Sequence, residues 1–133
     1  MIEWTEDLAT GVDSIDEEHK EIFFRFSLFL EDCKKGEGRE KLSMLLKFLE
    51  EYVSSHFRRE EDLMNRKSYP QMESHVEQHH HFFRTVETIK SQLEKEGSSI
   101  FLVADTNRKL MDWLVDHIKR TDRVLGAFLK AGR

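Results

Sequence analysis

Apolar residues recur at every third or fourth position over four long stretches of the chain. The stretches cover approximately residues 13–35, 39–67, 70–96 and 99–117, and the segment 122–130 carries a similar pattern. Such spacing is typical of amphipathic α-helices that bury one face. The sequences KKGEG, SYP and GSS separate the stretches with residues that end or begin helices. The pattern predicts an all-α protein, an up-down-up-down four-helix bundle with a non-helical N-terminal arm and a short C-terminal helical segment. We expect residues 1–133 to form a single domain.

Composition excludes several classes of partner. The formal net charge is −5, and no dense run of lysine and arginine is present, so we expect no nucleic-acid partner. No apolar run reaches the length of a membrane-spanning helix, so we expect no membrane insertion. The N-terminus lacks the pattern of a signal peptide, and the single Cys33 offers neither an internal disulfide nor a thiolate metal motif. These features indicate a cytoplasmic monomer whose outer faces leave room for a transient protein partner.

Polar residues that are costly to bury occupy the apolar faces of all four predicted helices. At 100° per residue, six side chains fall on these faces: His19, His56, Glu60, His75, His79 and His117. One such histidine would be an ordinary core residue with a hydrogen-bond partner. Five buried imidazoles need many partners, and each polar group that is left unpaired costs about 1–3 kcal/mol of stability. A metal would satisfy all of them together. His80 and His81 lie off the face and should point away.

The residue types restrict the metal. His56 and Glu60, and likewise His75 and His79, are spaced i,i+4, which makes their side chains neighbours on a helix. Six or seven ligands are too many for one tetrahedral zinc ion, and they suit two octahedral ions that share carboxylates. Imidazole and carboxylate without thiolate favour iron or manganese. A ferritin-like site is disfavoured, because only Glu77-x-x-His80 matches its Glu-x-x-His motif and lies mostly off the face.

A further bridging carboxylate is expected near His117. Asp122 is the candidate, but five residues of regular α-helix would turn it about 140° away and place Thr121 inward. Asp122 can reach the site only if the helix contains a one-residue π-bulge or ends between 117 and 122. Asp112 and Asp116 are rivals that point off the face, and we expect both to be solvated.

Four segments of the chain resemble the hemerythrins and, within them, the single-domain bacteriohemerythrins. They are WTEDLATGVDSIDEEHKEIF at 4–23, HFRREEDLM at 56–64, YPQMESHVEQH at 69–79 and WLVDHIKRTD at 113–122. The resemblance covers nearly the whole chain. It departs from the usual pattern at Glu18, where a glutamine normally precedes the first ligand histidine, and we expect this difference to matter little. Glu61 is expected to be a solvated neighbour of Glu60.

The resemblance implies a non-haem di-iron centre in a hemerythrin-like domain. Its cofactor would be two iron ions, cycling between Fe²⁺ and Fe³⁺, joined by an oxo or hydroxo bridge. One iron would be bound by His75, His79 and His117 and the other by His19 and His56, with Glu60 and Asp122 bridging the two. O2 would bind at the open position of the two-histidine iron. No catalytic residue and no cofactor-binding residue beyond the metal ligands is expected.

Three functions compete for such a site. The first is reversible O2 binding for carriage, storage or sensing, and carriage or storage is preferred because a sensor normally needs an output domain. The second is a di-iron enzyme acting on peroxide, nitric oxide or ferrous iron, and the third is a metal-free interaction module. Apolar and aromatic residues would line the pocket or simply form the core: Phe23, Phe26, Leu49, Trp113, Leu114 and Ile118. An enzyme would need a proton donor near the open position. Tyr52, in phase one turn before His56, is the one candidate for such a donor that is not already a ligand. We therefore expect the protein not to be an enzyme.

Overall fold

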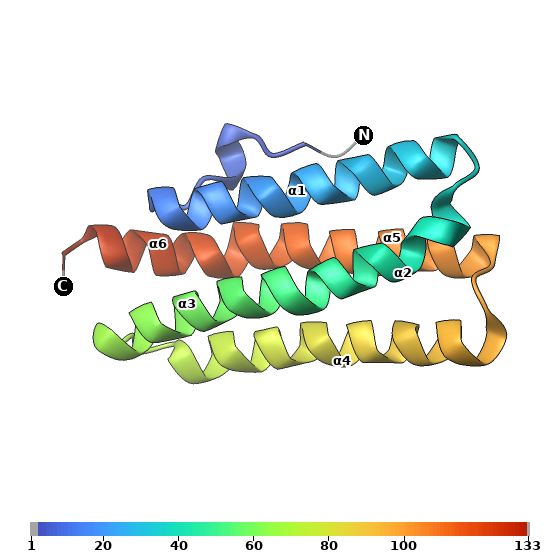
Figure 1. The fold of residues 1–133 in the computed structure, drawn as a ribbon. Helices are drawn as coiled ribbons and strands as arrows, with labels where there is room; N and C mark the ends of the chain where they lie inside the picture. The colour runs from blue at the N-terminus through green and yellow to red at the C-terminus, as the bar shows by residue number, and fades with distance from the viewer. Residues whose placement is uncertain (1–2, 133) are drawn as a thin grey trace.

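The computed structural model describes residues 3–132, and they form a bundle of four long helical rods (Figure 1). The first rod is α1, Asp13–Lys34, and the third is α4, Met72–Glu96. The second joins α2, Gly38–Phe48, through the π-helical turn η2, Leu49–Val53, to α3, Ser54–Arg66. The fourth joins α5, Ile100–His117, through the π-helical turn η3, Ile118–Asp122, to α6, Arg123–Lys130. The described residues contain no strand, which confirms the predicted all-α four-helix bundle.

The helix boundaries follow local sequence signals. Gly36 adopts a left-handed backbone conformation, φ 80°, in the turn after α1. The Ser99 hydroxyl accepts a hydrogen bond from the backbone N–H of Leu102 and so caps the start of α5. α4 begins at Met72, two residues later than the prediction from Pro70. None of the helices in the described residues is long and apolar enough to cross a membrane.

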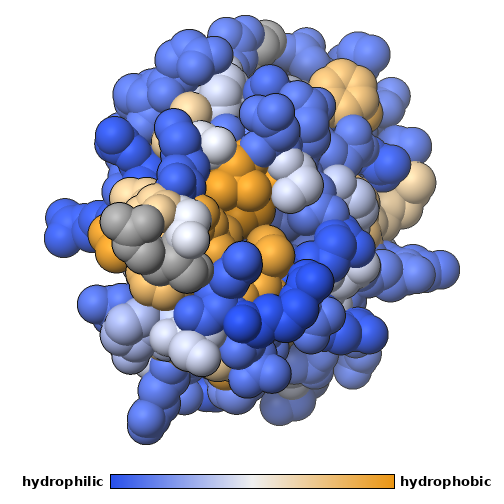
Figure 2. Space-filling model, turned by 90° about the vertical axis from the view of Figure 1, so that its left-hand side faces the viewer, coloured by the Kyte–Doolittle hydropathy of each residue, from blue (hydrophilic) through white to orange (hydrophobic). Residues whose placement is uncertain are grey.

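Two apolar clusters fill the interior of the bundle. The larger one includes Phe23, Leu49, Phe57 and Ile118, and the smaller one is built on Ile15, Met64, Tyr69 and Leu125. Three of the rods contribute residues to both clusters. In each of these rods a polar residue lies in the sequence between the residues of the two clusters, and these polar residues are His19, Glu60 and Asp122. Figure 2 looks onto the end of the bundle where α1 begins and α6 ends, and it shows a hydrophobic centre surrounded by hydrophilic residues. The polar residues therefore lie between two apolar layers that limit contact with water.

The N-terminal arm is fixed to the bundle by one buried carboxylate. Asp16 accepts hydrogen bonds from the backbone N–H and the hydroxyl of Thr10, both at 2.8 Å. A Cβ on Gly126 would lie 2.2 Å from the carbonyl oxygen of Thr10, so only glycine allows the arm to pack this closely on α6. The arm was expected to be non-helical, but it contains one short 3₁₀ turn, η1, Glu6–Leu8. Leu8 is buried at the end of that turn.

Candidate metal centre

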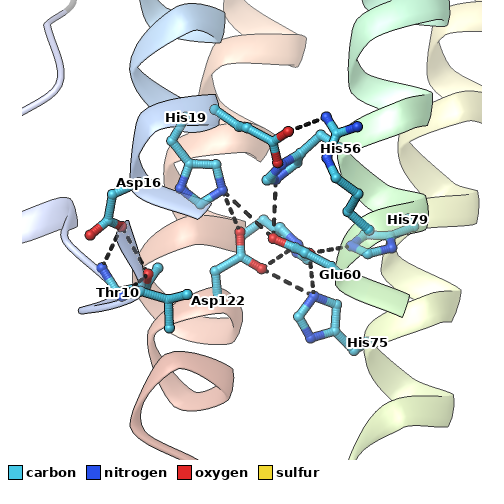
Figure 3. Close-up of polar contacts among 12 residues, drawn as sticks. Thr10, Asp16, His19, His56, Glu60, His75, His79 and Asp122 are labelled. Carbon is cyan, nitrogen blue, oxygen red and sulfur yellow. Dashed lines mark hydrogen bonds and ion pairs between the residues drawn. The ribbon is translucent and has the colours of Figure 1, made fainter. Parts of the chain in front are cut away.

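Seven polar side chains meet inside the bundle, and every rod contributes at least one. Each side chain is no more than 2% exposed, and the seven are His19, His56, Glu60, His75, His79, His117 and Asp122. Figure 3 shows the carboxylates of Glu60 and Asp122 at the centre, with the labelled histidines around them. These are the seven residues expected from the sequence, and the structure brings all of them together.

The seven residues form two overlapping groups that share both carboxylates. One group is His75, His79 and His117 with Glu60 and Asp122, and the other is His19 and His56 with the same two carboxylates. In each group the potential ligand atoms all lie within 4.8 Å of one another. The three-and-two division of the histidines is the one expected from the sequence resemblance.

The Glu60 carboxylate directs one oxygen atom toward each group. Its Oε1 lies 3.1 Å from Nε2 of both His75 and His79. Its Oε2 lies 3.0 Å from Nε2 of His56 and 3.8 Å from Nε2 of His19. A carboxylate in this position can therefore offer an oxygen to each of two ions.

Asp122 is divided between the two groups in the same way. Its Oδ1 lies 3.0 Å from Nε2 of His75 and 3.1 Å from Nε2 of His117, while its Oδ2 lies 3.0 Å from Nε2 of His19. The π-helical turn η3 makes this possible, because its extra residue rotates Asp122 back toward the face of His117. Of the two possibilities for the backbone, the structure has the π turn, and the helix continues beyond it as α6.

Hydrogen bonds on the far side of the imidazole rings leave nitrogen lone pairs pointing into the site. His56 donates from Nδ1 to Glu18, His79 donates from Nδ1 to Glu61, and His117 donates from Nδ1 to Gln78, each at 2.8 Å. A neutral imidazole that donates from Nδ1 carries a lone pair on Nε2. In all three rings that Nε2 faces a carboxylate oxygen, so the two lone pairs repel each other unless a cation lies between them.

Buried atoms without hydrogen-bond partners identify the same centre. They include the Nε2 atoms of His19, His56 and His117, one oxygen of Glu60 and both oxygens of Asp122. Buried polar groups are normally satisfied, and buried charges are normally paired or bound to a metal. These nitrogen and oxygen atoms are the donors that suit iron or manganese, so the residues fit a pair of such ions.

The pKa shifts of the buried groups show that the site favours positive charge beside its carboxylates. Burial alone lowers the pKa of His56, but the charge of Glu60 and the hydrogen bond to Glu18 outweigh it and raise that pKa to about 10. Burial acts on His75 in the same direction and is outweighed by Asp122 and Glu60, which raise its pKa to about 9. Burial raises the pKa of Glu60, yet the surrounding histidines hold it well below its usual value. Without metal, protons must supply the charge that metal ions would otherwise bring.

Comparison with known proteins agrees with this geometry. The family model described as "Hemerythrin HHE cation binding domain" matches residues 10–129. The chain belongs to the hemerythrin family. It is 31% identical to a myohemerythrin of Theromyzon tessulatum over 120 residues, which covers 90% of this chain and 87% of the relative. It is 29% identical to a bacteriohemerythrin of Methylococcus capsulatus over 132 residues, covering 98% of each chain. A bacteriohemerythrin of Pseudomonas paraeruginosa is 31% identical over 120 residues, which covers 90% of this chain and 75% of the relative.

Membership of the hemerythrin family assigns a class of cofactor and ligand. Hemerythrins are non-haem di-iron proteins that bind O2. The two groups of histidines, with shared carboxylates between them, fit such a centre. The resemblance to hemerythrins that the sequence motifs carried is thereby confirmed.

Two glutamates of this hemerythrin have roles that the sequence did not indicate. Glu61 was expected to be a solvated neighbour of Glu60, and its side chain is 30% exposed, but its carboxylate also accepts the Nδ1 proton of His79. Glu18 was expected to matter little, yet it accepts the Nδ1 proton of His56 and pairs with Arg59. Partners of this kind fix the orientation of a metal-binding imidazole and increase its basicity. In the sequence, the only sign of these roles was that Glu18 directly precedes His19 and Glu61 directly follows Glu60.

Aromatic rings hold two of the histidines in the hemerythrin site. Phe57 stacks on His79 with ring centroids 3.7 Å apart and an interplanar angle of 5°. Trp113, one of the expected pocket residues, stacks on His117 at 4.5 Å and 12°. Phe57 was not among the expected pocket residues, because it lies beside, and not on, the predicted apolar stripe. Of the other expected pocket residues, all five are buried: Phe23, Phe26, Leu49, Leu114 and Ile118.

Tyr52 belongs to a different environment. Its ring stacks on Phe48 with centroids 5.1 Å apart and is half-buried in the structure. Partial burial and the carboxylates of Glu18 and Glu21 raise the pKa of its hydroxyl. Tyr52 lies within the π turn η2, where a regular helical phase no longer applies. His80, His81, Asp112 and Asp116 are exposed, as expected.

Proposed function

We propose that this hemerythrin binds O2 reversibly at a di-iron centre and serves in oxygen carriage, storage or sensing. Residues 1–133 would form one hemerythrin-like domain around that centre. The observation that carries the proposal is the division of both Glu60 and Asp122 between a three-histidine and a two-histidine group. This division gives one metal position fewer protein ligands than the other, which leaves room for an exogenous molecule.

The seven residues would hold the cofactor in two unequal positions. His75, His79 and His117 would bind one iron, His19 and His56 would bind the other, and Glu60 and Asp122 would bridge them. When bound, a pair of ferrous ions with a solvent-derived oxo or hydroxo bridge supplies two electrons to O2 and can take them back. The protein's own contribution is to orient the imidazoles through Glu18, Glu61 and Gln78.

Apolar packing around the site favours binding over further chemistry. Ile118, Leu114 and Phe23 are at most 2% exposed and belong to the larger cluster beside the ligands. Such surroundings admit a small neutral gas and exclude bulk water. Within the described residues, the side chains that hydrogen-bond the outer Nδ1 nitrogens of these histidines are Glu18, Glu61 and Gln78, and each acts as an acceptor. The Tyr52 ring stacks on Phe48, and in the described part of the chain no hydrogen bond joins its hydroxyl to a candidate ligand, which favours O2 binding over oxidase or peroxidase chemistry.

A spectroscopic titration tests the proposal. The iron-loaded protein is reduced without oxygen, O2 is admitted, and the visible spectrum is recorded before and after O2 is removed. Reversible binding gives an absorption band that appears with O2 and disappears on its removal over repeated cycles. Immediate and irreversible oxidation, or turnover of peroxide in the presence of a reductant, would contradict the proposal and favour the enzyme.

A further inference from the structure

The burial of the candidate ligands raises the question of how iron reaches them. All seven are 2% exposed or less, and two apolar clusters lie on either side. A hydrated cation cannot pass through an apolar layer without losing its water, which is costly. A polar path between the helices is therefore needed.

A surface hollow between α1 and α3 provides such a path. Its volume is about 190 Å³, and Glu60 forms part of its lining. The remaining lining residues come from the first turns of α1 and the later turns of α3: Ser14, Ile15, Glu18, Arg59, Asp62, Leu63 and Arg66. Two larger hollows, of about 510 and 440 Å³, include none of the seven candidate ligands.

Glu60 connects this hollow to the two-histidine group. Its Oε2 has no hydrogen-bond partner and lies 3.0 Å from Nε2 of His56 and 3.8 Å from Nε2 of His19 (Figure 3). Glu60 is therefore the one candidate ligand in the lining of this hollow, and its carboxylate also reaches the two-histidine group.

An ion pair lies on one wall of the hollow. The carboxylate of Glu18 joins α1 to α3, because it pairs with Arg59 and also accepts the Nδ1 proton of His56. Arg59 is half exposed and is further held by the Ser55 hydroxyl at 2.7 Å. A half-exposed arginine can move into solvent at little cost, whereas Glu18 is held by the buried imidazole. Movement of Arg59 would leave the carboxylates of Glu18, Asp62 and Glu60 in the lining of the hollow, with Arg66 as the remaining cation there.

We propose that the hollow between α1 and α3 is the route by which ferrous ions enter and leave the centre, with Arg59 as its movable cover. The identity of the ion rests on the proposed di-iron function, but the route rests on the hollow, the Glu60 carboxylate and the Glu18–Arg59 pair.

Filling the mouth of the hollow is the first test. Ser14 is exposed and lines the hollow, so Ser14→Trp should narrow it without changing any charge. Ser74→Trp is the matched control, because Ser74 is exposed on α4 and does not line the hollow. Release is measured by mixing the iron-loaded protein with excess ferrous chelator without oxygen. Uptake is measured by adding Fe²⁺ to metal-depleted protein whose helical content has been checked by circular dichroism.

The two rates must change together if the hollow is the route. A narrower path raises the same barrier in both directions, so Ser14→Trp should slow release and uptake by a similar factor while iron content stays the same. Ser74→Trp should match the unmodified protein. Unchanged release from Ser14→Trp would overturn the proposal, and this comparison holds even if the metal-depleted protein is too unstable for uptake measurements.

Removing the cover is the second test. Arg59→Gln should accelerate Fe²⁺ uptake by about tenfold, since it exposes the carboxylates to the cation and removes a repelling charge. Arg58→Gln makes the same change of charge at the neighbouring exposed position, which lies outside the hollow. Equal uptake rates for the two variants would overturn the role of Arg59. Loss of O2 binding with these rate differences intact would instead count against the proposed function alone.

Discussion

His56 and His80 carry the same imidazole in very different surroundings. The His56 side chain is 1% exposed, whereas that of His80 is 61% exposed and pairs with Glu77 on the surface of α4. His56→Ala removes one of the two histidines of the smaller group, so we expect iron content to fall well below two ions per chain. His80→Ala should retain both ions. Iron per chain is measured colorimetrically after acid release, and a loss of iron in His80→Ala would show that helical phase misidentifies the ligands.

Glu61 should control the site without touching a metal. It accepts the Nδ1 proton of His79 at 2.8 Å, so Glu61→Ala releases the ring while the candidate ligand itself remains. We expect iron to bind about 10–100-fold more weakly, the usual cost of losing such a partner. Glu61→Gln keeps an acceptor and should recover most of the affinity. Competition with a ferrous chelator measures the effect, and Glu77→Ala, at an exposed position on α4, is the control. Equal affinities for Glu61→Ala and this control would contradict the role.

The π turn η3 brings Asp122 to the site, and its extra residue can be tested by deletion. The side chain of Arg120 lies in this turn and is 80% exposed. Deleting Arg120 should restore a regular α-helix in which the aspartate still follows His117 by one turn, so we expect iron binding to persist. Deleting the exposed Asp112 from regular helix should rotate the following residues by about 100° and abolish binding. Iron content and helicity of both variants check this pair. Binding lost on deleting Arg120 but kept on deleting Asp112 would refute the phase argument.

Helical periodicity predicted the rods because each one buries a single face. It also placed His19, His56, Glu60, His75, His79 and His117 on those faces, since each lies in or beside a regular stretch. Asp122 could be reached only by allowing an irregular turn, and the choice between a π turn and a helix end required the structure. The π turn η2 and the contacts of Glu18 and Glu61 were not predictable from phase, because they depend on how neighbouring rods pack.

At the scale of the whole molecule, the bundle buries two carboxylates and five histidines between two apolar layers. Glu60 and Asp122 are at most 1% exposed, and the pKa of each lies well below its usual value because the histidines surround them. The bundle can keep these carboxylates charged only if protons or metal ions compensate them. Metal-free protein should therefore depend on pH more strongly than the iron-loaded protein does.

The direction of that dependence follows from the raised pKa values. The pKa of His56 rises from 6.5 to about 10 and that of His75 rises from 6.5 to about 9 on folding. Below pH 6.5 both the folded and the unfolded chain hold these protons, so the full stabilisation from protonated His56 and His75 is present. Between pH 6.5 and about 10 the unfolded chain releases its protons first, so the metal-free bundle loses stability as pH rises. On the acid side, stabilisation from Glu60 is lost as pH falls below 4.5, because its pKa is lowered in the fold.

We therefore expect the melting temperature of metal-free protein to fall between pH 6.5 and 9.5, as circular dichroism can measure. Bound iron replaces the protons, and metal binds deprotonated imidazoles more readily as pH rises, so the loaded protein should show a much smaller decrease. The gap between the two melting temperatures should widen with pH. His80→Ala, which changes only an exposed imidazole, should follow the unmodified protein. A metal-free melting temperature that rises over this range would mean that protons do not compensate Glu60 and Asp122, and the centre would need another source of positive charge.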